Sequence, residues 1–359
     1  MLYYALYSLR TTHSIFNVFR YTTFRSLVAA LMALSISFLL GPWLIRRLTE
    51  NQIGQPIRTD GPERHKVKAG TPTMGGTLIL FSLILATLLL ADLSNPYIWL
   101  VLLVTLGFGA IGFVDDYRKF RYGSSAGLAA RHKFLAQCAV ATLGAVLLLL
   151  IPEFQPTVAV PFFKNVKADL GLFYLPFAAL VVVGASNAVN LTDGLDGLAI
   201  GPVMITAGTY AVFAFVTGNA KLADYLQIPF VAGAGELPVF CSALAAAGLG
   251  FLWFNAYPAQ MFMGDVGSLP LGAALAMVAL ITKHELVFPL VGAIFVVEAL
   301  SVIAQVAYFK WTGGKRIFRM APIHHHYELK GWPEPLIIVR FWIISIICAL
   351  LALSTLKLR

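Results

Sequence analysis

Ten long apolar runs dominate this sequence and constrain its fold more than any other feature. A helix needs about 20 residues to cross the hydrocarbon core of a bilayer, and each run comes close to that length. Only 12% of the 359 residues are charged, whereas a soluble domain has about 25%. We therefore predict an all-α polytopic membrane protein, a single transmembrane domain over 1–359. The expected helices lie at 24–45, 74–91, 97–114, 134–151, 172–190, 198–217, 238–256, 266–282, 287–309 and 337–356.

The basic residues predict which helix ends face the cytoplasm. If all ten runs cross, alternate loops share one side, and one set of loops holds 16 of the 26 Lys and Arg residues. The positive-inside rule places that set in the cytoplasm and both termini in the periplasm. The loops concerned are 46–73, 115–133, 191–197, 257–265 and 310–336.

Residues 1–23 and the net positive charge of the chain are both explained by a membrane. Residues 1–23 lack the pattern of a cleaved signal, so we interpret them as a periplasmic interfacial segment preceding a bundle over 24–356. The net charge of +9 is explained by juxtamembrane cations beside anionic lipid. Membrane lipid is therefore an expected partner, and nucleic acid is not.

Two adjacent carboxylates, Asp115 and Asp116, end the third apolar run, and Lys119 follows one helical turn later. Adjacent carboxylates repel each other unless a cation lies between them. Oxygen-rich sites with a few carboxylates suit Mg²⁺, especially when substrate phosphates supply other ligands. The alternative interpretation is an ordinary solvated helix end.

The fifth apolar run continues into a ladder of amides and carboxylates, Asn187, Asn190, Asp193 and Asp196, at intervals of three residues. If the segment stays helical, this spacing keeps neighbouring side chains close. A connection this short does not need four such groups for solubility. The ladder therefore indicates a binding site.

A third polar segment brings Asn255, Phe262, Gly264 and Asp265 to the same side of the membrane. Asp265 stands at the start of the eighth run, where the helix dipole alone would favour an anion. That alternative stays open for Asp265 taken by itself.

Three consecutive histidines, His324, His325 and His326, lie in the last basic connection. Zinc ligands on a helix are spaced three or four residues apart, and adjacent residues point in different directions. We therefore favour phosphate donors or a proton relay over a zinc site. In the preceding run, Glu298 and Gln305 belong to a polar stripe, and a membrane-embedded Glu is a functional candidate.

Further polar groups lie on the same side, namely Lys68, Thr73 and Lys133. For a single Lys, plain topology is a sufficient explanation. As a group, these residues could bind an anionic substrate.

Taken together, these segments resemble the polyprenyl-phosphate N-acetylhexosamine-1-phosphate transferases, most closely the family that transfers phospho-MurNAc-pentapeptide. The resemblance runs nearly end to end. It is carried by TPTMGG at 71–76, DDYRK at 115–119, NLTDGLDGLA at 190–199, FMGDVGSL at 262–269 and PIHHHYE at 322–328.

The resemblance implies a Mg²⁺-dependent enzyme of the bacterial cytoplasmic (inner) membrane with its active site facing the cytoplasm. It would transfer phospho-MurNAc-pentapeptide from UDP-MurNAc-pentapeptide to undecaprenyl phosphate, giving lipid I and UMP in peptidoglycan synthesis. The family also admits a homodimer, although no sequence motif specifies one.

The resemblance also implies roles for individual residues. Asp265 would bind Mg²⁺, while Asp115, Asp116 and His324 would belong to the catalytic centre. Substrate binding would involve Lys68, Thr73, Lys119, Lys133, Asn187, Asn190, Asp193, Asp196, Asn255, Phe262, Gly264, Gln305, His325 and His326.

Three alternatives to this function remain at the level of sequence. One is a non-enzymatic scaffold, which predicts that Asp265→Asn abolishes no turnover. A transferase of GlcNAc-1-phosphate would use the same lipid, and only the PIHHHYE segment favours the muramoyl substrate. A transporter would explain ten helices and a polar stripe at Glu298. However, transporters usually place key charges near the bilayer midplane, and here the carboxylates gather at one face.

Overall fold

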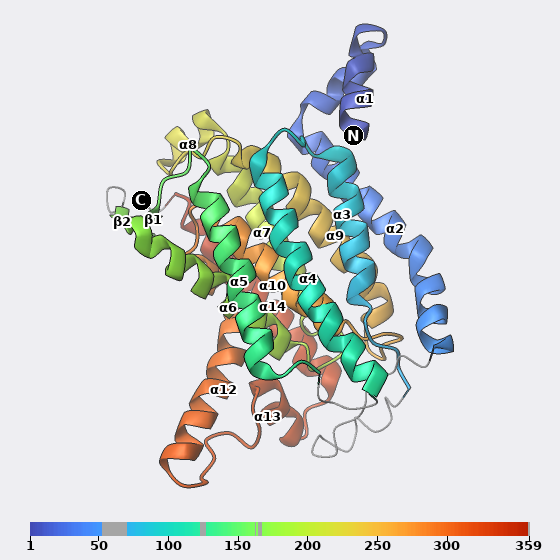
Figure 1. Ribbon diagram of the computed structural model, residues 1–359, viewed down its shortest axis with the longest axis vertical. Coiled ribbons are helices and arrows are strands. Elements are labelled where there is room, and N and C mark those ends of the chain that lie inside the picture. The colour runs from blue at the N-terminus through green and yellow to red at the C-terminus, as the bar shows by residue number, and fades with distance from the viewer. Residues whose placement is uncertain (52–69, 123–126, 162, 164–166, 358–359) are drawn as a thin grey trace.

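Ten apolar helices form the body of the protein (Figure 1), and each corresponds to one of the ten apolar runs. The computed structural model describes residues 1–51, 70–122, 127–161, 163 and 167–357. Eight of the helices in this described part are long and apolar enough to cross a membrane, and α3 and α10 are shorter. The ten are α2 (Thr22–Glu50), α3 (Gly76–Leu90), α4 (Pro96–Tyr122), α5 (Ala130–Leu149), α6 (Tyr174–Thr192), α7 (Ile200–Thr217), α9 (Leu237–Asn255), α10 (Asp265–Ile281), α12 (Ala293–Trp311) and α14 (Glu334–Ser354).

Helix α10 lies at the centre of the bundle, where α3, α4, α6 and α7 contact it. Every residue from Val266 to Ile281 is buried. Because protein rather than lipid surrounds α10, its 17 residues need not match the thickness of a bilayer. The first residue of this central helix is Asp265, so the fold places that carboxylate where several helices end together.

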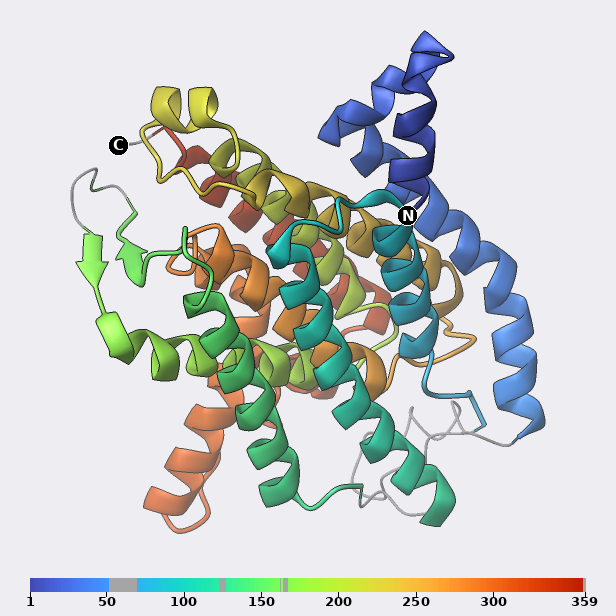
Figure 2. The same cartoon turned by 45° about the horizontal axis from the view of Figure 1, so that its top comes forward.

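The two chain termini lie at the same end of the bundle, as Figures 1 and 2 both show, and α12 and α13 (Ile323–Leu329) project at the other end. An even number of crossing helices requires the termini to share a side. Asp115, Asp116 and Asp265 lie at the end opposite the termini.

Several helices differ from the expected bounds. Helix α4 continues to Tyr122, so Asp115, Asp116 and Lys119 are helical rather than part of a loop. The run at 287–309 divides at Gly292 into α11 (Phe288–Val291) and α12. The three histidines lie on α13, within a segment we expected to be a loop. Polar residues at helix ends hide such continuations from a reading of hydropathy.

The end that carries the termini also contains elements that the sequence did not predict. A two-stranded antiparallel sheet pairs Thr157 with Asp169. These strands are three residues each, which is too short for a recognisable alternation. The remaining elements among the described residues are α1 (Leu2–Ser8), η1 (Leu9–Thr11), η2 (Ser14–Arg20), β1 (Thr157–Ala159), β2 (Lys167–Asp169), η4 (Gly171–Phe173), α8 (Ala220–Leu226) and η5 (Ala234–Glu236).

Candidate active site

Three carboxylates meet where α4 and α10 adjoin. One oxygen each of Asp115, Asp116 and Asp265 lies within 4.8 Å of the others. Asp115 and Asp116 are buried, and Asp265 is partly buried. Residues 150 positions apart in the chain therefore form one acidic cluster, which we call the carboxylate cluster.

Two glycines let the backbones of this cluster approach so closely. A Cβ atom on Gly112 of α4 would lie 2.1 Å from the carbonyl oxygen of Asp265. Gly264 has a φ of 73°, and its Cβ atom would lie 2.6 Å from Asp116 Oδ2. Only glycine has neither the clash nor the strain of this backbone conformation. The close approach of the two backbones thus explains why glycine occupies positions 112 and 264.

Backbone amides fix the direction of the first two carboxylates. The N–H of Val266, in the first turn of α10, donates to Asp116 Oδ2 at 3.0 Å. The N–H of Leu128 donates to Asp115 Oδ1 at 2.8 Å. Each Asp therefore points one oxygen at a backbone donor, and its other oxygen faces the lysines of the cluster.

Two lysines bind the carboxylate cluster. The Nζ atom of Lys119 lies 2.6 Å from Asp115 Oδ2, 3.3 Å from Asp116 Oδ1 and 3.1 Å from Asp265 Oδ2. The Nζ atom of Lys133, on α5, contacts Asp265 Oδ2 and lies 3.7 Å from Asp115 Oδ2. Two ammonium groups against three carboxylates leave one negative charge, so the cluster can accept a further cation.

The donor set of the carboxylate cluster fits Mg²⁺. Mg²⁺ prefers carboxylate oxygens in octahedral geometry at about 2.0–2.1 Å, which puts neighbouring oxygens about 3 Å apart and opposite ones about 4 Å apart. The three Asp oxygens lie close to that range. Lys119 already occupies a position in contact with all three, which shows that a compact cation fits there.

Of the four ladder residues, Asn187 and Asn190 lie on α6, which ends at Thr192, so the helical spacing that we expected does not extend to Asp193 and Asp196. Asn190 Nδ2 lies 2.8 Å from both Asp265 Oδ1 and Ser268 Oγ. One turn earlier, Asn187 donates instead to Gln137 Oε1 on α5, at 2.8 Å. Asn190 therefore orients the carboxylate of Asp265, whereas Asn187 joins two helices.

Asp193 follows directly after α6, and its electrostatic surroundings place it beside the cluster. Burial, together with the charges of Asp265, Asp116 and Asp196, raises the pKa of its carboxyl to about 8. Each of these negative charges penalises the ionised form of Asp193. A cation bound among them would relieve that penalty.

The connection between α6 and α7, which begins at Asp193, is hydrogen-bonded to the connection between α9 and α10. Asp196 Oδ2 accepts a hydrogen bond from the N–H of Ala259 at 3.0 Å. Asn255 accepts from the N–H of Gly197 and donates to the carbonyl of Met261, both at 2.9 Å. Trp342 Nε1 of α14 donates to the Gly197 carbonyl at 3.2 Å. Asn255 therefore fixes the backbone of both connections. Trp342 helps to fix the backbone at Gly197, and the sequence did not predict this role because Trp342 lies within an apolar run.

The predicted residues Thr73, Phe262 and Gly264 lie together. The N–H of Phe262 donates to the carbonyl of Pro72, and the N–H of Gly75 donates to the carbonyl of Phe262, both at 2.8 Å. The TPTMGG segment is therefore hydrogen-bonded to the segment that precedes Asp265. Lys68 lies outside the described residues.

The histidines form a separate group on α13. The Nδ1 atom of His324, which is fully buried, lies 3.1 Å from Glu298 Oε2. The Nδ1 atom of His325 lies 2.6 Å from Glu328 Oε2, and His326 Nδ1 accepts from the N–H of Arg319. Among the described residues, no histidine belongs to a group of three or more potential metal ligands.

Gln305, at the end of the polar stripe on α12, braces the connection before α13. Its Oε1 atom accepts hydrogen bonds from the N–H groups of Ile317 and Phe318, at 3.1 and 3.0 Å. The structure thus joins Gln305 to the approach to the histidines and not to the carboxylate cluster.

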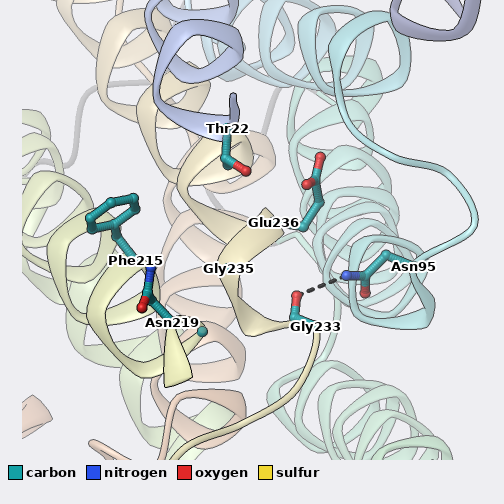
Figure 3. A pocket seen from close by; sticks show the side chains of 8 residues that line it. Thr22, Asn95, Phe215, Asn219, Gly233, Gly235 and Glu236 are labelled. Carbon is teal, nitrogen blue, oxygen red and sulfur yellow. Dashed lines mark hydrogen bonds between the residues drawn. The ribbon is translucent and has the colours of Figure 1, made fainter. Parts of the chain in front are cut away.

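A pocket of about 260 Å³ is lined by residues at the start of α2, the end of α7 and the segment before α9 (Figure 3). None of the predicted site residues lines it. Its wall includes Glu236, which is ion-paired with the buried Arg25 of α2. The pocket is therefore separate from the carboxylate cluster. Its lining residues are Thr22, Asn95, Phe215, Gly218, Asn219, Gly233, Gly235 and Glu236.

Known proteins resemble this chain over its whole length. Residues 98–283 match the family model of glycosyl transferase family 4, and residues 68–80 match phospho-N-acetylmuramoyl-pentapeptide-transferase signature 1. The phospho-N-acetylmuramoyl-pentapeptide-transferase of Syntrophus aciditrophicus (strain SB) is 60% identical over 359 residues, all of both chains. The proteins of that name from Desulfatibacillum aliphaticivorans and Geobacter sp. (strain M21) are 61% and 58% identical, again over all of both chains.

Proposed function

Since this chain belongs to the phospho-N-acetylmuramoyl-pentapeptide-transferase family, we propose that the carboxylate cluster is the active site at which it makes lipid I. The substrates are UDP-MurNAc-pentapeptide and undecaprenyl phosphate, and the second product is UMP. The observation that carries the proposal is the contact of one ammonium group, that of Lys119, with all three carboxylates from two helices.

Asp265, with Asp115 and Asp116 beside it, would hold Mg²⁺. When bound there, Mg²⁺ neutralises charge on the diphosphate of the nucleotide sugar and on the departing UMP. Asn190 keeps one oxygen of Asp265 in place by hydrogen bonding. The surroundings of Asp193 support this assignment, because after burial the charges of Asp265 and Asp116 are the next causes of its raised pKa.

Lys119 and Lys133 provide the cations that transfer of a phosphoryl group requires. Such reactions depend mainly on positioning and on neutralising charge that spreads over nonbridging oxygens. Both ammonium groups are bound by carboxylates of the cluster. When phosphates and a metal ion enter, these ammonium groups can turn from the carboxylates to phosphate oxygens.

The lipid phosphate would attack directly. A phosphate monoester has its second pKa near 6, so the acceptor is largely dianionic at neutral pH and needs no strong base. Its oxygen forms the new bond to the phosphorus that carries the sugar, and the bond from that phosphorus to UMP breaks. Asp115 or Asp116, each fixed by a backbone amide, would orient the acceptor or take a residual proton.

A covalent aspartyl-phosphate route is the alternative, and rapid-quench labelling separates the two. The enzyme is mixed with radiolabelled nucleotide sugar without the lipid acceptor and is denatured within milliseconds. Direct attack predicts no label on the protein. A phosphosugar trapped on an Asp side chain would refute it.

The nucleotide sugar would bind between the cluster and the connections that carry Asp196 and Phe262. Asp196 suits the edge of a uracil ring and Phe262 its face. Asn255 and Gln305 would shape this pocket through the backbone that they brace, with Lys68, Thr73, His325 and His326 at its borders. Asn187 would act from behind Asn190 through the contact between α5 and α6.

The protein is a multi-pass membrane protein, and we propose that the carboxylate cluster faces the cytoplasm of the inner membrane. The excess of Lys and Arg at that end supports this orientation. Single cysteines at Asp224 and Lys315, in a background without native cysteines, test it with an impermeant maleimide on intact cells. Only position 224 should react. A homodimer stays a proposal that ultracentrifugation in detergent can test.

The substrate assignment is tested by competition between donors. UDP-MurNAc-pentapeptide and UDP-GlcNAc are supplied together with undecaprenyl phosphate and Mg²⁺, and consumption of each nucleotide sugar is followed. Consumption of the muramoyl donor alone is expected. Consumption of UDP-GlcNAc would reassign the enzyme to the related transferases of GlcNAc-1-phosphate.

A further inference from the structure

Glu298 and His324 form a pair that is sealed from solvent. Glu298 lies within α12, His324 lies on α13, and both side chains are buried with 0% exposure. The Nδ1 atom of His324 lies 3.1 Å from Glu298 Oε2. Among the described residues, no side-chain oxygen or nitrogen atom of the pair has a hydrogen-bond partner, and this 3.1 Å approach is the polar contact that the structure gives them. The two side chains therefore depend on each other.

The energetics of burial favour keeping such a pair together. A buried carboxylate without a partner is strongly destabilising, and so is the removal of one member of a buried pair. The contact of Glu298 with Nδ1 favours the imidazole tautomer that carries its proton on Nδ1. The other ring nitrogen, Nε2, is then the one that can accept a proton or a hydrogen bond.

The direction of Nε2 is set by a glycine in the loop after α6. A Cβ atom on Gly194 would lie 2.2 Å from His324 Nε2, so the imidazole edge packs on the backbone at this position. Gly194 directly follows Asp193 in the connection after α6. Nε2 therefore packs against the backbone of the segment that carries Asp193 and Asp196.

We propose that Glu298 is a positioning residue for the transferase reaction, and that it acts through His324. Glu298 holds the imidazole in one tautomer and one orientation, with Nε2 packed on the backbone of Gly194 next to Asp193. A carboxylate behind a histidine has this effect in other enzymes, where it fixes both the tautomer and the ring plane. The proposal rests on the proposed function, because it takes His324 to belong to the active site.

A double-mutant cycle in the purified full-length enzyme tests this dependence. The variants are Glu298→Gln, His324→Gln and the combination, since a glutamine at either position can still hydrogen-bond to its neighbour. We expect Glu298→Gln alone to lower kcat by roughly 10–100-fold, with the KM values of both substrates changed by less than about threefold. In the His324→Gln background the same change should cost no further activity.

A merely structural role for Glu298 predicts a different pattern. The loss would then follow the fall in thermal midpoint and would multiply with the loss from His324→Gln, which would overturn the proposal. Ser301→Ala is the matched control, because Ser301 lies one turn along α12 and donates to the Glu298 carbonyl without contacting His324. If Glu298→Gln does not fold, Glu298→Asp replaces it in the cycle. This variant keeps the carboxylate but shortens the side chain by one methylene, and its loss of activity must show the same dependence on His324.

Asp265→Asn, measured beside these variants, separates the two proposals. Full activity of Asp265→Asn would show that the proposed active site is wrong, whatever Glu298 does. Loss of activity in Asp265→Asn together with wild-type activity in Glu298→Gln would refute only the positioning role.

Discussion

Replacing Gly264 with alanine perturbs the carboxylate cluster without removing any of its charges. The new Cβ atom would lie 2.6 Å from Asp116 Oδ2 and 3.1 Å from Thr73 Oγ1. Gly264 also has φ 73° and ψ 175°, a region that is nearly restricted to glycine. The variant must therefore both strain its backbone and displace the carboxylate of Asp116.

The expected cost follows from these two effects. Backbone strain of this kind costs about 1–3 kcal/mol. Moving Asp116 weakens or breaks its hydrogen bond from the N–H of Val266. A hydrogen bond to a charged group contributes about 1.5–3 kcal/mol to the stability of the folded protein. A shift of about 1 Å in a reacting group can lower the rate about 100-fold. We expect a lower thermal midpoint and a fall in kcat of that order.

The matched control is Gly184→Ala on α6. Nothing lies within 4 Å of a Cβ atom on Gly184, and alanine favours a helix over glycine by about 1 kcal/mol. The control should keep full activity and an unchanged or raised midpoint. Both are measured by lipid I synthesis from radiolabelled donor and by thermal unfolding in detergent. Wild-type activity and stability of Gly264→Ala would refute the close approach on which the site depends.

Three further predictions concern charge, backbone and metal. The folded-state pKa of Asp193 is raised to about 8, so its contribution to stability is present below pH 4 and is lost as pH rises through 8. With a chelator present, Asp193→Asn should therefore raise the thermal midpoint at pH 9 and leave it unchanged at pH 4. Equal shifts of the midpoint at the two pH values would contradict this prediction. Trp342→Phe removes the hydrogen bond to Gly197 and should raise the KM for the nucleotide sugar several-fold at unchanged KM for the lipid, whereas an unchanged donor KM would exclude the bracing role. Mg²⁺ at about 100 times its Kd should stabilise the wild type by about 2.7 kcal/mol and Asp265→Asn by much less, and equal stabilisation would place the metal elsewhere.

The positions of the helices could be predicted because lipid imposes a length and a composition on each span. All ten apolar runs correspond to helices, and the family resemblance is confirmed by relatives about 60% identical over the whole chain. The ends were less predictable. Asp115 and Asp116 lie inside α4 because helices continue past the hydrocarbon, where polar residues no longer report the secondary structure.

The meeting of separate segments could not be predicted from spacing. Residues three apart on a helix are rotated by about 300°, so Asn187 and Asn190 diverge by about 60°, and only Asn190 reaches Asp265. Asn187 donates to Gln137, and a polar residue within the apolar run at 134–151 is a sequence feature that could have predicted this contact between helices. Trp342 carried no signal, because an indole donor within an apolar run is not distinguished from packing.

The most direct test of the account is lipid I synthesis by Asp265→Asn. The variant is compared with the wild type and with Asp224→Asn, the same change at an exposed residue of α8 at the other end of the bundle, using UDP-MurNAc-pentapeptide, undecaprenyl phosphate and Mg²⁺. The account predicts that Asp265→Asn is folded but forms no detectable lipid I or UMP, while Asp224→Asn matches the wild type. Wild-type turnover by Asp265→Asn would contradict the assignment of the carboxylate cluster as the active site.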